Sequence, residues 1–206
     1  EEAFSISDRV AIMNAGRIMQ LDTPEVLYQR PANDFVARFV GFENLIPLTV
    51  VARDGAVVTA EAAGGARLHL SQDVFGAIKD TFTLAARPDG LAVRAQGEGI
   101  PAALGTRTYL GRAYQYKCQT AAGELTANGS LSELFEPGAQ AVLVPMPEQC
   151  CILDRTIGDM RVYNREMNEL QERYGEWFLQ KGDQTDLTRL ERSAIEHELA
   201  DTILVG

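Results

Sequence analysis

The stretch "SDRVAIMNAGRIMQLDTPEVLYQRP", residues 7–31, holds the signals of two strands and a helix in immediate succession. Residues 9–13 and 17–21 are rich in apolar side chains, which is typical of strands. Asn14-Ala15-Gly16 separates them, and Asn and Gly tolerate the positive φ of a tight turn. The stretch therefore predicts a β-hairpin followed directly by a helix.

The helix has a well-marked start. Thr23 supplies a hydroxyl N-cap, Pro24 occupies the first helical position and Glu25 places a carboxylate in the first turn. We expect this helix to reach about Arg30 and to stop before Pro31.

A second short helix follows. We expect Asn33 to cap it and Gly41 to end it. Its apolar residues fall on one helical face; they are Phe35, Val36, Phe39 and Val40.

From about residue 45 to residue 154, short β-type runs alternate with Gly, Pro and Asn. We expect a hairpin about Gly64-Gly65, two strands about Pro88-Asp89-Gly90 and a short helix over residues 130–135. Many short strands at regular spacing indicate a small barrel or sandwich. In the strand over residues 114–119 the side chains alternate between two faces; Tyr114, Tyr116 and Cys118 share one face, and Gln115, Lys117 and Gln119 share the other.

The last fifty residues predict an αα-hairpin. Apolar residues spaced 3, 4, 3, 4 and 3 apart form a heptad seam; they are Met160, Tyr163, Met167, Leu170, Tyr174 and Trp177. After the break at residues 181–183, a second helix has its own apolar stripe; its members are Leu187, Leu190, Ala194, Ile195, Leu199 and Ile203. The seam packs either within its own chain or against a second copy, and the spacing fits both.

Composition restricts the function. With 46% hydrophobic and 23% charged residues the chain is globular, and no apolar run is long enough to span a bilayer. A net charge of -10 argues against nucleic-acid binding, including single-strand binding by a small β-barrel. Cys118, Cys150 and Cys151 form no disulfide framework or zinc motif, so we expect free thiols.

No catalytic motif is present. The sequence contains no phosphate loop, no GxGxxG, no HExxH and no GxSxG. Its two histidines, His69 and His197, lie in a strand-like run and in a charged helical segment, where structural or solvated roles are expected. We therefore expect no catalytic, cofactor-binding or metal site in this chain.

The residues quoted so far resemble a known family. Residues 1–41, "EEAFSISDRVAIMNAGRIMQLDTPEVLYQRPANDFVARFVG", resemble the end of the nucleotide-binding subunit of ABC importers of the maltose, polyamine and ferric-iron type. Further along, Arg87-Pro88-Asp89 resembles the family's "RPE" signature, Tyr109-Leu110-Gly111-Arg112 resembles its "YLG" strand, and residues 141–146 resemble its closing strand.

The resemblance implies a mainly β fold with three parts. These are the last strands and helices of an ABC ATPase domain over residues 1–41, an OB-like (TOBE) regulatory domain over residues 45–154, and the helical hairpin over residues 155–206. The chain would then be a C-terminal fragment that starts just after the family's switch histidine. The phosphate loop, ATP and magnesium would belong to the preceding part of the parent protein.

The resemblance also implies a function. The fragment would regulate and dimerise an importer ATPase that lies peripherally on the cytoplasmic face of the membrane and works with integral-membrane permease subunits. It would bind no nucleic acid and would not insert into the membrane. An alternative is a solute-sensing or oxyanion-sensing module that down-regulates transport; its candidate ligands are Arg107, Thr108, Arg112 and Lys117.

Overall fold

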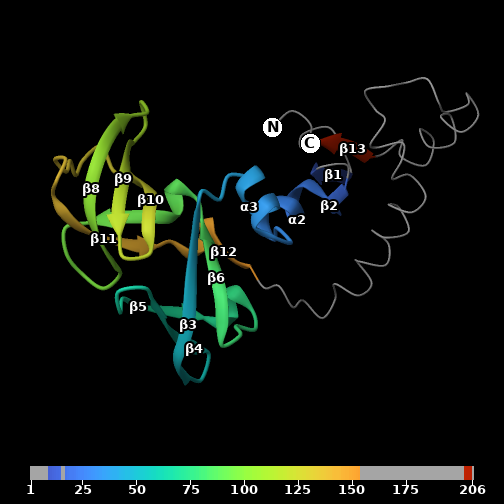
Figure 1. Cartoon of the computed structure of the whole chain (residues 1–206), viewed down its shortest axis with the longest axis horizontal. Helices are drawn as coiled ribbons and strands as arrows, with labels where there is room; N and C mark the ends of the chain where they lie inside the picture. Colours follow the sequence, from blue (N-terminus) through green and yellow to red (C-terminus); the bar gives the residue numbers. More distant parts are fainter. Residues whose placement is uncertain (1–8, 15–16, 154–201, 206) are drawn as a thin grey trace, which may run out of the picture. The chain divides into compact units, whose positions relative to one another are not determined.

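A computed structural model describes residues 9–14, 17–153 and 202–205 of the chain (Figure 1). The chain divides into two compact units, and the boundary falls after Val36, within the second helix. The first unit contains the residues before this boundary together with residues 202–205, and the second contains residues 37–153.

The first unit has a three-stranded sheet in the order β13-β1-β2. Strands β1 (Arg9–Asn14) and β2 (Arg17–Asp22) form the predicted antiparallel hairpin. The expected turn over residues 14–16 falls mainly outside the described residues. In β1 the consecutive side chains of Val10, Ala11 and Ile12 are all buried, a pattern typical of a strand covered on both faces.

The first helix begins as predicted. Thr23 Oγ1 accepts a hydrogen bond from the Val26 amide at 3.4 Å, and α2 (Pro24–Gln29) has proline at its start. Buried Gln20 joins β2 to the exit of this helix: its side chain donates to the Arg30 carbonyl at 3.1 Å and accepts from the Ala32 amide at 2.7 Å.

The second helix also has its predicted cap. Asn33 Oδ1 accepts from the Val36 amide at 3.0 Å, and α3 spans Asp34–Phe39. Gly41, with φ of +94°, follows the helix as expected. Phe39, which the sequence places on the apolar face, is 44% exposed in the structure.

The second unit consists of two five-stranded antiparallel sheets, which Figure 1 shows. The first sheet has the order β12-β6-β3-β4-β5. Its strands are β3 (Asn44–Asp54), β4 (Val57–Ala62), β5 (Arg67–Ser71), β6 (Thr81–Ala86) and β12 (Cys150–Leu153). The predicted hairpin about Gly64-Gly65 joins β4 to β5, and both glycines have positive φ.

The second sheet has the order β10-β9-β8-β11-β7. Its strands are β7 (Leu91–Arg94), β8 (Ile100–Tyr109), β9 (Tyr114–Thr120), β10 (Gly123–Gly129) and β11 (Gln140–Pro145). Short helical turns connect the strands of this unit; they are α4 (Gln72–Phe75), η1 (Pro88–Gly90) and η2 (Pro147–Gln149). The unit is therefore mainly β, as predicted.

Both sheets contribute to one hydrophobic core, which includes Ile46 and Leu84 from the first sheet and Leu104, Tyr116 and Leu143 from the second. In β9 the predicted alternation is confirmed, because Tyr116 and Cys118 point into this core.

A buried asparagine links the two sheets. Asn44 in β3 donates to the Ala86 carbonyl at 3.1 Å and to the Thr126 carbonyl at 2.8 Å. Its Oδ1 accepts from the Thr126 amide at 2.7 Å. Because Thr126 lies in β10, one side chain satisfies backbone groups in both sheets.

Two details differ from expectation. Residues 130–135 form a turn instead of a helix, because Ser130 Oγ accepts from the Ser132 amide at 3.1 Å and Pro137 leaves too little length. The two strands predicted about Pro88-Asp89-Gly90 are confirmed as β6 and β7, which flank η1 and belong to different sheets.

The second difference concerns residues 202–205. Ile203 lies in β13 (Thr202–Val205), which pairs in parallel with β1, so its predicted place in a helical stripe is wrong. β-branched residues in the segment "TILV" favour extended backbone. The heptad seam and the remainder of the predicted helical hairpin lie outside the described residues.

Candidate functional site

The first candidate site is the junction around η1, where the predicted family motifs meet. Arg87 is buried, and its guanidinium lies 3.8 Å from the centroid of the Phe42 ring. Its Nη2 donates to the Val40 carbonyl at 3.4 Å, and its backbone amide donates to the Gln149 carbonyl at 3.1 Å. One arginine therefore holds the segment that leads into β3 against the start of η1.

The next residues of the motif continue this junction. Pro88 starts η1, and the Asp89 carboxylate accepts from Arg112 Nη2 at 3.3 Å and from Asn128 Nδ2 at 2.8 Å. Gly90 packs so closely that a Cβ there would lie 2.6 Å from the Gln149 carbonyl oxygen, so this position requires glycine.

The second motif lies at the tip of the β8–β9 hairpin. Gly111, with φ of +80°, permits the turn, and Tyr109 donates its hydroxyl proton to the Gly111 carbonyl at 3.0 Å. Leu110 lies exposed at the tip. Arg112 follows this motif, so its contact with Asp89 brings the two predicted motifs together, although they are 20 residues apart in sequence.

Exposed apolar side chains lie at this end of the second sheet. Tyr114 pairs with Tyr109 on one side and with Gly129 on the other, so β8 and β10, which flank β9, both end level with the start of β9. The end of β8 and the loops that follow β8 and β10 carry four large exposed hydrophobic residues, which we call the apical patch: Tyr109, Leu110, Leu131 and Leu134. Apolar clusters of this kind mark interaction surfaces.

The cations proposed as oxyanion ligands do not form one site. Arg107 Nη1 donates to the Phe135 carbonyl at 2.9 Å and lies 3.3 Å from a Glu136 carboxylate oxygen. Arg112 contacts Asp89, and Lys117 Nζ donates to Thr126 Oγ1 at 2.7 Å. Each cation has a different partner, and no contact of the described residues joins one of them to another.

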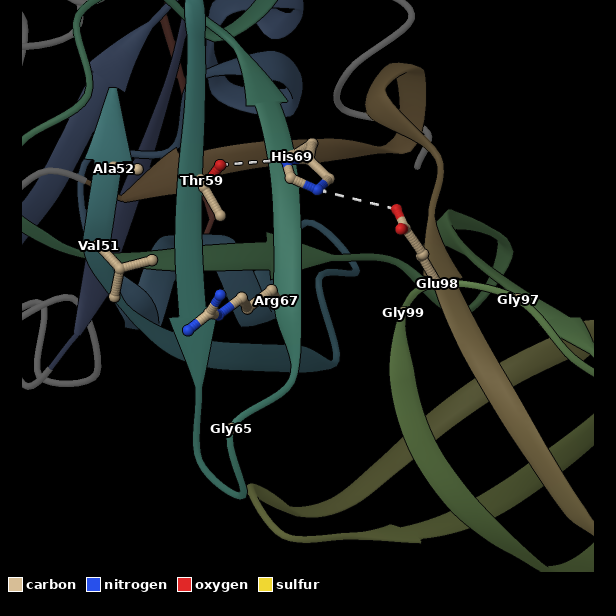
Figure 2. Close-up of a pocket in the computed structure, with 9 residues that line it drawn as sticks. All are labelled: Val51, Ala52, Thr59, Gly65, Arg67, His69, Gly97, Glu98 and Gly99. Atoms are coloured by element: carbon tan, nitrogen blue, oxygen red, sulfur yellow. Dashed lines mark hydrogen bonds and ion pairs between the residues drawn. The ribbon is translucent and has the colours of Figure 1, made fainter. Parts of the chain in front are cut away.

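The second candidate site is an open polar groove of about 590 Å³ on the first sheet (Figure 2). Its floor is the solvent face of the β4–β5 hairpin, with the β-bulge at Val51 beside it. The loop between β7 and β8, residues 97–99, forms a wall of the groove. Pockets of this volume are large enough for a small molecule.

The polar side chains of the groove are connected. Thr59 Oγ1 lies 3.1 Å from His69 Nδ1, and His69 Nε2 lies 3.8 Å from Glu98 Oε2; both contacts are drawn as dashed lines in Figure 2. Arg67 Nε lies 3.4 Å from Glu61 Oε2 on the paired strand. The sequence placed His69 in a strand but did not identify the residues around it. The register of the β4–β5 hairpin would have predicted the cross-strand pairs Thr59–His69 and Glu61–Arg67.

Burial lowers the reactivity of the three cysteine thiols. Burial raises the pKa of the Cys118 thiol to about 11 and those of the Cys150 and Cys151 thiols to about 12. A thiol is nucleophilic only as a thiolate, so none of the three is activated at neutral pH. Across the described part of the chain, no group of three or more His, Cys, Asp or Glu side chains has metal-binding geometry.

Comparison with known proteins identifies the family. A model of the TOBE domain matches residues 84–153, a range that includes both motifs of the η1 junction. The spermidine/putrescine import ATP-binding protein PotA 1 of Pseudomonas aeruginosa is 33% identical over 159 residues, which are 74% of this chain and 43% of that protein. The chain is a homologue of ABC-importer ATP-binding subunits and carries their TOBE domain.

Other members of the family match similarly. The PotA protein of Rubrobacter xylanophilus is 36% identical over 160 residues, covering 74% of this chain and 42% of that protein. The Fe(3+) ions import ATP-binding protein FbpC of Streptomyces avermitilis is 35% identical over 141 residues, covering 66% and 38%. The predicted resemblance to these ATP-binding proteins and the predicted TOBE domain are thus confirmed, and the chain spans less than half the length of these relatives.

A solved structure is also similar. The cytoplasmic molybdate-binding protein ModG, in a crystal form with molybdate bound, aligns with a TM-score of 0.43 and 15% identity, covering 53% of this chain and 94% of that chain. No helix in the described residues is long and apolar enough to cross a membrane.

Proposed function

We propose that this chain is the regulatory and dimerisation portion of an ABC-importer ATP-binding subunit. The observation that carries the proposal is the TOBE match over residues 84–153 within a longer similarity to import ATP-binding proteins. In this proposal, ATP and magnesium bind to a preceding part of the protein, and their hydrolysis drives solute import.

The partners follow from the same family. The whole subunit would bind integral-membrane permease subunits and lie peripherally on the cytoplasmic face of the membrane. Two subunits would associate through their regulatory portions, and the apical patch supports this step because it offers an apolar surface at the loop tips. The heptad seam from Met160 to Trp177 is a second candidate surface for the same contact.

A chimera tests the proposal. Residues 9–153 of this chain would replace the matched portion of the Pseudomonas aeruginosa PotA 1 protein in a strain that lacks it, and uptake of labelled spermidine would be measured. We expect uptake above that of the deletion strain, because the matched portion would support the parent ATPase. A Val74→Ser chimera, altered at an exposed apolar residue on α4, is the control for surface changes.

A chimera that accumulates normally and hydrolyses ATP but restores no uptake would contradict the proposal. A Tyr109→Ser/Leu110→Ser chimera tests dimerisation through the apical patch separately from the other parts of the proposal. We expect it to accumulate normally and to lose uptake, whereas the Val74→Ser chimera should retain it.

A further inference from the structure

We propose that the groove on the β4–β5 hairpin is a binding site for a short dicarboxylate anion, independent of the proposed transport role. The groove has a volume of about 590 Å³, and two side chains on its floor can carry positive charge, namely Arg67 and His69 (Figure 2). The argument rests on what each of these groups already contacts.

Arg67 is the first anchor. Its Nε is turned toward Glu61 Oε2 at 3.4 Å, which orients the guanidinium. Its two terminal amino groups make no hydrogen bond among the described residues, and the side chain is 65% exposed. A pair of guanidinium N–H groups matches the two oxygens of a carboxylate, so the orientation leaves a binding edge available to a ligand.

His69 is the second anchor, two residues along the same strand. Leu68 and Leu70 are buried, whereas Arg67 and His69 both point to solvent. The contact between Thr59 Oγ1 and His69 Nδ1 holds the ring at 3.1 Å, and His69 Nε2 faces the groove. The Cα atoms of residues two apart on a strand lie about 6.6 Å apart. The two carboxylates of succinate or glutarate can span a separation of this size.

The Glu98 carboxylate already lies beside the second anchor, His69. Its carboxylate lies 3.8 Å from His69 Nε2, yet its side chain is 87% exposed. Gly97 and Gly99 flank it, with φ of +131° and +153°, and a Cβ on Gly97 would meet nothing within 4 Å. We infer that Glu98 is an internal carboxylate that a ligand carboxylate can displace.

The charges in and beside the groove are mixed. Among the lining residues Arg67 is cationic and Glu98 is acidic, and Glu61, the cross-strand partner of Arg67, is a second acidic group beside the groove. A ligand carboxylate that displaces Glu98 from His69 therefore replaces one negative charge by another at that position.

Proton NMR of the intact chain tests the proposal through its imidazole signals. The chain has two histidines, so a His197→Gln variant leaves His69 as the single source of the signal. We expect glutarate to shift this signal saturably. Butyrate, which has one carboxylate, should cause a shift that does not saturate over the same concentrations.

Variants in the same background assign the contacts. Arg67→Gln should weaken glutarate binding by about fivefold or more, and Glu98→Gln should strengthen it by about twofold to fivefold. Arg30→Gln, at an exposed arginine far from the groove in sequence, is the matched control and should bind as the parent does. The fold of each variant is checked by its thermal unfolding.

Several outcomes would overturn the proposal. A shift of the His69 signal that rises linearly with glutarate concentration, or that is equal for glutarate and butyrate, would show that the ligand does not use both Arg67 and His69. Equal saturable binding of inorganic phosphate would identify a general anion patch instead. Retained binding in Arg67→Gln, or weaker binding in Glu98→Gln, would contradict the assigned roles.

Discussion

At the scale of single residues, the η1 junction depends on a buried cation. The Arg87 guanidinium packs on the Phe42 ring and donates to the Val40 carbonyl. Such a side chain contributes both packing contacts and a positive charge. A shorter residue loses the packing contacts, and a neutral residue loses the charge.

We expect Arg87→Ala to lower the free energy of unfolding by about 2 kcal/mol, because it removes a cation–π contact and a hydrogen bond from a buried position. Urea unfolding followed by circular dichroism measures the change. Arg94→Ala, at an exposed arginine on β7, should change it by less than about 0.5 kcal/mol. Equal effects of the two substitutions would contradict the structural role of Arg87.

Asn44, which links the two sheets, allows a second test at the scale of single residues. Asn44→Ala leaves the amide and the carbonyl of Thr126 without their side-chain partner, so the unfolding free energy should fall by about 2–4 kcal/mol. Gln119→Ala, on the exposed face of β9, should cost less than about 1 kcal/mol. An Asn44→Ala variant as stable as the parent chain would show that the sheets do not depend on this link.

The cysteines make stability sensitive to alkali. Burial raises their pKa from 9.0 to about 11 or 12, so the folded state keeps protons that the unfolded state has lost. This contribution to stability is complete below about pH 8 and is lost as the pH rises through 9 toward 12. Urea unfolding at about pH 8 and about pH 10.5 should therefore show lower stability at the higher pH.

Cys151→Ala isolates the thiol from other groups that titrate in alkali. The fall in unfolding free energy between the two pH values should be smaller in this variant than in the parent chain, whatever its absolute stability. An identical fall in both proteins would contradict the burial of this thiol.

At the scale of elements, β1 needs a neighbour on each side. Val10, Ala11 and Ile12 are buried in succession, β2 pairs with one edge, and β13 pairs in parallel with the other. Parallel pairing satisfies backbone groups that would otherwise lie open at the edge of the strand.

Ile203→Pro removes a backbone N–H from β13 and should weaken this pairing. Hydrogen–deuterium exchange should then be faster at residues 10–12 and unchanged in β8 and β9. Ile203→Val, which keeps the N–H and the β-branched character, is the control. Unchanged exchange at residues 10–12 in the proline variant would show that β13 does not protect β1.

The sequence allowed the local elements to be predicted well where chain signals are strong. The cap at Thr23, the hairpin glycines at residues 64–65 and the alternation in β9 were all correctly inferred, because each rests on neighbouring residues. Local patterns failed for residues 130–135, where Ser130 forms a turn, and at Ile203, where a distant strand determines the structure.

The candidate sites were harder to predict for the same reason. The motifs at residues 87–89 and 109–111 were recognised, but their contact through Arg112 and Asp89 depends on tertiary packing. The groove at Arg67 and His69 needs the register of β4 against β5 and a loop from elsewhere in the chain. Neither arrangement can be derived from local sequence spacing.

At the scale of the whole molecule, charge opposes self-association. Two copies with a net charge of -10 repel each other, and salt reduces this repulsion. The apical patch offers an apolar surface beside both signs of charge, since Arg112 lies near Asp89 and Arg107 near Glu136. A surface that contains both signs can complement its own copy across a two-fold axis.

Light scattering of the intact chain during size-exclusion chromatography tests the central claim, that this chain is a dimerising regulatory portion. The account predicts a mass of twice the 22.5 kDa of one chain at physiological salt, and the same mass for Val74→Ser. A lower mass for Tyr109→Ser/Leu110→Ser would place the contact at the apical patch, and a lower mass for Met167→Ser/Leu170→Ser would place it at the heptad seam. A single species of 22.5 kDa at every concentration would contradict the account.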